Sequence, residues 1–169
     1  GPLGKRPGPV DAVFQLCCTL RKGVMAMNEF GDDLAAKADR YLVLCEERRL
    51  DEAARFLAAD PVLTFPGPVR FTNLRDMVAD AAERYREVRK HRTTYIVGKR
   101  VSDGRDVVIS TGTLDGIALD GTEFKNVRYS DMFVFRDGLI AEQYVFNDLA
   151  ESGSAPSWAE RHRTSTASS

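Results

Sequence analysis

The chain has 169 residues, of which 43% are hydrophobic and 29% are charged, with a formal net charge of −1. This balance is typical of one globular domain with its own core, and it excludes the basic surface of a dedicated nucleic-acid binder. No apolar run approaches the roughly 20 residues that span a bilayer. Three cysteines and two histidines match no disulfide or metal pattern, so we expect no metal, no cofactor and a reducing, cytoplasmic setting.

The first 30 residues form no clear element. The opening Gly-Pro-Leu-Gly is typical of a protease-cleavage remnant, and Met25 and Met27 are each a candidate natural start. We expect a loosely attached extension over residues 1–30, a folded domain over 31–150, and a flexible tail over 151–169 that is rich in Ser, Ala and Thr.

The first half of the domain is predicted to be mainly helical. "DDLAAKADRYLVLCEERRL" begins at Asp32 and has apolar residues at helical spacing. "DEAARFLAAD" predicts a shorter helix, and "PVLTFPG" predicts a short strand. "TNLRDMVADAAERYREVRK" predicts a long helix that ends at Lys90, with its charge run on the solvated face.

After Lys90 the apolar period changes from that of a helix to that of a strand. Four strands are predicted at "TTYIVGKRV", "DVVISTGTL", "TEFKNVRYSDMFVF" and "LIAEQYVFN", with turn sequences between them. Helices segregated from such a meander indicate an α+β domain. We expect a curved antiparallel sheet wrapped by three N-terminal helices into a cone with an internal cavity.

The third of these strands contains an unexpected carboxylate, Asp131, within "RYSDMFVFRDG". A carboxylate in a strand that is apolar on both faces costs several kcal/mol unless it is hydrogen-bonded, paired or protonated. Two interpretations stay open. Asp131 is either a structural group bonded to Ser130, Asn126 or the backbone, or the chemical centre of a pocket.

The register of the following hairpin decides which residues surround Asp131. If "RDG" is a three-residue loop with Gly138 in the left-handed conformation, Asp131 pairs with Gln143, and we favour this register. If "DG" alone is the turn, Asp131 faces Tyr144 instead. The favoured register places Ala141, Gln143 and Val145 on the face of Asp131, with Asn147 at the end of the same row.

Two segments carry a resemblance to a known superfamily. "YLVLCEERRLDEAARFLAADPVLTFPG" and "RYSDMFVFRDGLIAEQYVF" resemble the nuclear transport factor-like superfamily, which includes ketosteroid isomerase, SnoaL-type polyketide cyclases and scytalone dehydratase. The resemblance covers roughly residues 32–149. In ketosteroid isomerase a Tyr and a protonated Asp form the oxyanion hole, and these fall on Tyr41 and Asp131. The general base of that enzyme falls on Phe65, so this chain departs from the isomerase there.

The resemblance implies a site for a small apolar carbonyl compound. Asp131 and Tyr41 would donate hydrogen bonds to an oxygen that gains charge as an enolate forms, Gln143 would assist, and His91 would be a reserve base. His91 is equally interpretable as a surface residue at a helix end. Further side chains are expected to line the pocket, although core packing also explains them: Phe65, Phe71, Tyr85, Tyr129, Phe133, Val145 and Asn147.

Two functions are therefore predicted from different classes. The first is a cofactor-independent acid/base enzyme, a cyclase, isomerase or dehydratase (lyase) of specialised metabolism. The second is a non-catalytic ligand-binding or dimerisation module of the same fold. In either case we expect a homodimer through the sheet, because four apolar residues share one face of the late strands: Met132, Val134, Tyr144 and Phe146.

Overall fold

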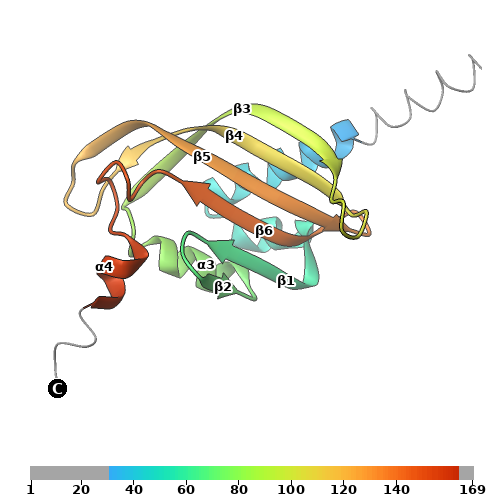
Figure 1. The fold of residues 1–169 in the computed structure, drawn as a ribbon, viewed down its shortest axis with the longest axis horizontal. Helices are drawn as coiled ribbons and strands as arrows, with labels where there is room; N and C mark the ends of the chain where they lie inside the picture. Colours follow the sequence, from blue (N-terminus) through green and yellow to red (C-terminus); the bar gives the residue numbers. More distant parts are fainter. Residues whose placement is uncertain (1–30, 164–169) are drawn as a thin grey trace, which may run out of the picture. The chain divides into compact units, whose positions relative to one another are not determined.

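The computed structural model describes residues 31–163, and Figure 1 shows a curved sheet with helices against it. Contacts divide the chain into one unit over Gly1–Asp33 and a second over Leu34–Ser169, and the fold below is that of the second unit. The predicted extension over residues 1–30 lies outside the described residues, as do residues 164–169. Among residues 31–163 no helix is both long and apolar enough to cross a membrane.

The first helix runs to residue 46 and follows the predicted apolar spacing. Leu34, Ala38 and Tyr41 lie on one face and are almost fully buried. On its flank, Asp39 Oδ1 accepts hydrogen bonds from Arg92 Nε at 2.6 Å and from the Tyr95 hydroxyl at 2.6 Å. These bonds fix the helix against the sheet, and the prediction of this helix is confirmed.

The second predicted helix is shorter than expected. Helix α2 (Leu50–Ala53) continues into a 3-10 turn, η1 (Ala54–Phe56), and strand β1 (Leu57–Phe65) begins directly afterwards. The segment "LAAD" has helical propensity, but Leu57 pairs with Ile140 across the sheet and both are buried. Tertiary pairing therefore overrides local propensity here.

The third predicted helix is wrong over its second half. Helix α3 (Leu74–Ala81) is capped by Asn73, whose side chain accepts a hydrogen bond from the Asp76 backbone at 2.9 Å. It ends far before Lys90, and strand β3 (Glu87–Lys99) contains the charge run that we assigned to a helix face. The run alternates with period 2 as well, and continuous pairing with the next strand selects the extended form.

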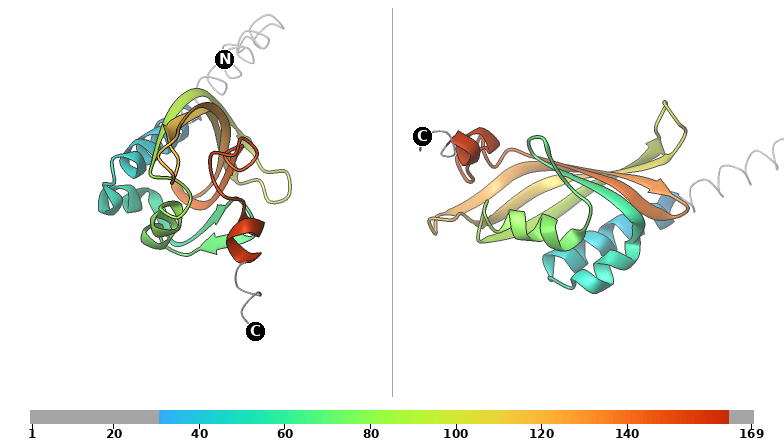
Figure 2. Two further views of the ribbon diagram at one scale, coloured as in Figure 1. Left: turned by 90° about the vertical axis from the view of Figure 1, so that its left-hand side faces the viewer. Right: turned by 90° about the horizontal axis from the view of Figure 1, so that it is seen from below.

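The sheet has six strands in the order β2-β1-β6-β5-β4-β3. Besides β1 and β3 it contains β2 (Val69–Phe71), β4 (Asp106–Ile117), β5 (Glu123–Arg136) and β6 (Leu139–Asn147). All neighbours are antiparallel except β1 and β6, which are parallel. The sheet is strongly curved but unclosed (Figure 2). The α+β class and the curved sheet are confirmed, whereas three N-terminal helices and a cone are not.

Two glycines allow the sharp curvature between β3 and β4. A Cβ atom on Gly112 would lie 1.9 Å from the carbonyl oxygen of His91, and one on Gly116 would lie 2.0 Å from that of Glu87. Any side chain at these positions would push the β3 backbone away. The close approach therefore requires glycine at both positions.

The β5–β6 hairpin differs from both predicted registers. Asp137 (φ 53°) and Gly138 (φ 75°) form a two-residue turn with positive φ at both positions. Phe135 pairs with Ile140 and Val134 with Glu142, so that Ala141 is an extra, bulged residue.

This bulge shifts every later pair by one residue. Asp131 pairs with Val145, and Phe133 pairs with Gln143, so the predicted direct pairs of Asp131 with Gln143 or Tyr144 are wrong. The predicted faces are nevertheless correct, because Gln143 and Val145 lie on the Asp131 side of the sheet.

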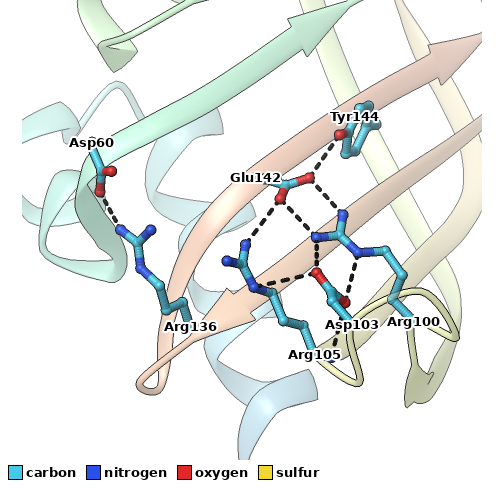
Figure 3. A network of polar contacts seen from close by, with 7 residues as sticks. All are labelled: Asp60, Arg100, Asp103, Arg105, Arg136, Glu142 and Tyr144. Carbon is cyan, nitrogen blue, oxygen red and sulfur yellow. Dashed lines mark hydrogen bonds and ion pairs between the residues drawn. The ribbon is translucent and has the colours of Figure 1, made fainter.

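The outer face of β6 carries a charged network (Figure 3). Glu142 accepts hydrogen bonds from Arg100 Nη1 at 2.8 Å, from Arg105 Nη1 at 3.2 Å and from the Tyr144 hydroxyl at 2.7 Å. Arg100 and Arg105 belong to the β3–β4 connection, so the network holds that connection over β6. Glu142 thus points outward, whereas its neighbour Gln143 is buried on the inner face.

A short C-terminal helix, α4 (Trp158–Arg163), lies within the segment that was predicted as a tail. Arg161 Nη2 donates to Asp80 Oδ1 at 2.7 Å and to Glu83 Oε2 at 2.9 Å, which joins α4 to the end of α3. Trp158 lies against Gly67, where an added Cβ would be 2.8 Å from the indole ring. No helix was expected in this segment.

Candidate active site

A cavity lies between the inner face of the sheet and the helices that cover it. The volume open to the centre of a water molecule is about 90 Å³, and the cavity is partly open to solvent. Its wall is mainly apolar, with a few polar side chains. The principal lining residues are Leu42, Cys45, Glu46, Arg48, Phe65, Met77, Val78, Ala81, Tyr85, Val88, Lys90, Leu114, Tyr129, Gln143, Val145, Asn147 and Leu149.

Asp131 lies behind this wall, paired with Lys90. The carboxylate is 0% exposed, and its Oδ2 accepts a hydrogen bond from Lys90 Nζ. Its Oδ1 has no hydrogen-bond partner among the described residues. Lys90 lines the cavity and its side chain is 19% exposed, so it is the member of the pair that reaches the cavity.

Curvature of the sheet brings these two residues together. Lys90 pairs with Leu114 on β4, whereas Asp131 pairs with Ser110, four residues away on the same strand. On a flat sheet their Cα atoms would lie roughly 16 Å apart, which is more than the two side chains can span. The curvature of the sheet (Figure 2) shortens this distance, and the Lys90 ammonium lies over the Tyr129 ring, 4.5 Å from its centroid.

The electrostatics of the pair are set by burial and by the opposite charge. Burial raises the pKa of Asp131, because the ionised carboxylate loses its hydration, and the positive charge and hydrogen bond of Lys90 oppose that shift. The net direction is upward. A carboxyl group with a raised pKa holds a proton more readily than an exposed carboxylate and is the stronger base when ionised.

Tyr41 and Gln143 form a second buried polar pair next to the first. The Tyr41 hydroxyl donates to Gln143 Oε1 at 2.8 Å, and its ring meets Phe133 edge-on at 5.8 Å. Burial raises the pKa of Tyr41 well above its ordinary value, so the phenol keeps its proton. Gln143 also lines the cavity, and its amide N–H groups are available as hydrogen-bond donors while its oxygen accepts from Tyr41.

With this geometry established, comparison with known proteins identifies the family. The family model of the SnoaL-like domain matches residues 38–143, more than half of the chain. The chain belongs to the SnoaL-like domain family. No functionally characterised protein in a curated collection matches the sequence significantly.

Solved structures with the same fold are distant in sequence. An NTF2-like protein of unknown function from Burkholderia pseudomallei has 17% identity and a TM-score of 0.58, over 71% of this chain and 94% of that one. TerC, crystallised with polyporic acid, has 14% identity and a TM-score of 0.57, over 72% and 95%. A candidate polyketide cyclase from Xanthomonas campestris has 14% identity and a TM-score of 0.53, over 72% and 95%. At these identities the likeness establishes the fold alone.

The SnoaL-like domain places most of the predicted site residues at the cavity. Five predicted lining residues do line it: Phe65, Tyr85, Tyr129, Val145 and Asn147. Gln143 lines it as well, but Asp131 and Tyr41 lie behind the wall and contact the cavity through Lys90 and Gln143.

Three predicted residues lie elsewhere. Phe133 is fully buried in the core. Phe71, on strand β2, packs against Phe65, and the centroids of the two rings are 5.8 Å apart. His91 is on the face of β3 opposite to Lys90, is exposed, and has its Nε2 2.9 Å from Asp115 Oδ2. It does not face the cavity, because neighbouring residues of a strand point to opposite sides.

Lys90 is the site residue that sequence reasoning missed. A signal was present, since Val88, Lys90 and Arg92 alternate with exposed residues in "EVRKHR", but we interpreted that segment as a helix. Cys45, also unpredicted at the site, contributes only a small apolar surface, because burial raises the pKa of its thiol to about 11. Within residues 31–163, no group of His, Cys, Asp and Glu side chains forms a metal site.

Proposed function

We propose that this SnoaL-like domain is a cofactor-independent acid/base enzyme acting on a small, largely apolar carbonyl compound. The reaction would be a cyclisation, isomerisation or dehydration in cytoplasmic specialised metabolism. One observation carries the proposal: a fully buried carboxyl group, Asp131, is paired with a lysine in the wall of a mainly apolar cavity. Structural relatives that include a candidate polyketide cyclase and a complex with polyporic acid support the same class of ligand.

The roles follow from the geometry. The ligand's carbonyl oxygen binds to the Lys90 ammonium and to the Gln143 amide, because both residues line the cavity. As a proton leaves the carbon next to the carbonyl, charge builds up on that oxygen, and donors already in place stabilise it. Because Asp131 contacts the cavity only through Lys90, Lys90 passes a proton to Asp131 and takes up the ligand's proton in its place, and the reverse transfer returns a proton to another carbon or oxygen.

Exchange of ligand protons for deuterium tests this function without knowledge of the natural substrate. In D₂O, the protein should accelerate exchange at the carbon beside the carbonyl of α-tetralone by on the order of 10²-fold, followed by NMR. Asp131→Asn should return exchange to background while circular dichroism stays unchanged. Asp106→Asn, at an exposed ion pair with Lys99, is the matched control and should keep full activity. A folded Asp131→Asn protein with undiminished exchange would rule out the assigned role.

The second candidate is a non-catalytic binding module of the same fold. It is favoured by the complete burial of Asp131, which reaches the cavity only through Lys90, and by Phe65 at the position of the isomerase base. This alternative predicts saturable ligand binding in the cavity with no proton exchange by the wild-type protein.

We also propose a homodimer formed through the outer face of the sheet. Ile96, Ile109, Met132 and Tyr144 follow one another across four paired strands on this face, and Ile96 is 54% exposed. Phe146, on the next row, is 57% exposed. Of the predicted interface, Val134 is fully buried in the chain itself and cannot contribute. An apolar row of this kind favours a second copy as its cover.

A further inference from the structure

The amine of Lys90 has an unusual environment for a lysine. Its side chain is four-fifths buried, it lines a mainly apolar cavity, and its Nζ lies over an aromatic ring. Among the described residues, Asp131 is the hydrogen-bond acceptor for Nζ. Surface lysines such as Lys99, with a 63% exposed side chain, have no such enclosure. A desolvated lysine next to a carbonyl site has the chemistry of an amine nucleophile.

The Lys90 ammonium has a proton acceptor in direct contact. Asp131 is in direct contact with Nζ and is fully enclosed, so transfer of one proton turns the ion pair into a neutral amine and a neutral acid. Burying two neutral groups costs less than burying two charges, and entry of an apolar ligand would remove the remaining water. The second oxygen of Asp131, Oδ1, has no partner that would hold it in the ionised state.

The cavity also provides donors for the oxygen of an intermediate. Gln143 lines it, and its amide N–H groups are available as donors while its oxygen accepts from Tyr41. Tyr85 lines the same space and can contribute its hydroxyl as a further donor. An oxygen held by these donors would lie beside Lys90, as carbonyl addition requires.

We propose that Lys90 binds carbonyl ligands covalently, as an imine (Schiff base), with Asp131 as its proton partner. The inference rests on the proposed function, because it takes the same cavity as the site of a carbonyl compound. Asp131 accepts a proton from the Lys90 ammonium, and the free amine forms a C–N bond to the carbonyl carbon. The amine proton moves to the oxygen, Asp131 protonates the resulting hydroxyl, the C–O bond breaks, and one water molecule leaves. The product is a protonated imine beside an ionised Asp131, and no oxidant or reductant is consumed.

Such an adduct would give the protein an electron sink without a cofactor. A protonated imine draws electrons from the adjacent carbon more strongly than the parent carbonyl does, which lowers the barrier to proton removal there. The ligand class is therefore narrowed to compounds with an aldehyde or an unhindered ketone carbonyl on an apolar, preferably aromatic, body, because ester carbonyls would not form a stable imine.

Reductive trapping tests the proposal directly. The full chain is treated with benzaldehyde and cyanoborohydride at neutral pH, and peptide mass mapping locates the benzyl groups. Lys90 should be modified about tenfold faster than Lys99 and Lys125, which serve as internal controls on exposed strand positions. Equal or slower labelling of Lys90 would overturn the proposal, and because the wild-type protein is used, no variant needs to fold.

The Asp131→Asn variant distinguishes proton transfer by Asp131 from a purely electrostatic role. If Asp131 takes part in proton transfer, the variant labels Lys90 about tenfold more slowly. If Asp131 only holds the ammonium by its charge, its removal frees the amine and labelling becomes faster, which would refute the assigned role. Failure of trapping with proton exchange on α-tetralone intact would leave the acid/base function standing without the covalent step. Trapping without exchange would leave the adduct standing and refute the catalytic function.

Discussion

Replacing Lys90 by methionine should destabilise the protein in a pH-dependent way. The change keeps an unbranched side chain that is shorter by one atom, but it leaves Asp131 fully enclosed without its cation. Breaking a buried ion pair from one side costs about 3–5 kcal/mol, which for a chain of this size corresponds to a fall in Tm of roughly 6–20 °C. Thermal unfolding followed by circular dichroism measures it.

The pH dependence follows from the direction of the Asp131 pKa shift. Burial already raises the pKa of Asp131 in the fold, and loss of Lys90 removes what opposed that shift. In the unfolded chain the group titrates at its ordinary value of about 3.9. Between these two values the folded protein binds a proton that the unfolded chain has released, so stability falls as pH rises. Relative to the wild-type protein, the Lys90→Met variant should therefore lose little stability at pH 4 and most at pH 8.

Two further variants serve as controls for this prediction. The double variant Lys90→Met/Asp131→Leu should regain most of the lost stability at pH 8, because no buried charge remains. Lys99→Met, at an exposed pair with Asp106, should change the free energy of unfolding by about 1 kcal/mol or less at either pH. An equal loss at pH 4 and pH 8 in Lys90→Met would refute the reasoning, since the penalty would then not depend on the charge of Asp131.

Three other predictions concern the sheet, its outer face and the C-terminal helix. Gly112→Ala should lower stability by several kcal/mol or prevent folding, because its Cβ would lie 1.9 Å from a backbone oxygen, whereas Gly98→Ala, with nothing within 4 Å, should be tolerated in the same denaturant titration. Phe146→Asp should convert a dimer into a monomer by light scattering while Val101→Asp, at a fully exposed position, should not, and a monomeric wild-type protein at micromolar concentration would exclude the dimer. Arg161→Gln should speed amide hydrogen exchange at the end of α3, because it removes three side-chain hydrogen bonds there; unchanged exchange would show that α4 does not hold α3.

Much of the architecture followed from apolar periodicity, and the main error came where two periods fit the same residues. The favoured register correctly placed Asp131 and Gln143 on one face, although the expected three-residue loop was wrong: a two-residue turn followed by the bulge at Ala141 gives the same faces. The segment "ERYREVRKHR" satisfies both a helix with a solvated face and a strand with alternating charges. Pairing with β4 selects the strand, and that long-range contact cannot be deduced from the local sequence. Because the segment was interpreted as a helix, Lys90, the residue that completes the site, was not predicted.

The details of the site depended on features that no local pattern specifies. The partner of Asp131 is a residue that a flat sheet would place roughly 16 Å away, so the contact depends on the curvature of the sheet. Tyr41 and Gln143 were both predicted at the site, but Gln143 was placed opposite Asp131, where the structure has Val145, and its hydrogen bond with Tyr41 was not predicted. Both cases show that side-chain faces could be deduced from the sequence, whereas distances across the sheet could not.

The extra residue at Ala141 has a consequence for how this strand can vary. The turn fixes Phe135 opposite Ile140, and a regular ladder from there would carry Glu142 to the core beside Phe133. The inserted residue turns the carboxylate outward, to Arg100 and Arg105, and sends an uncharged amide inward. Deleting Ala141 would leave every cross-strand partner beyond it unchanged and would only straighten the strand. Loss of Ala141 would therefore keep Glu142 outside and Gln143 inside, whereas a one-residue deletion beyond it would exchange the two faces of the strand.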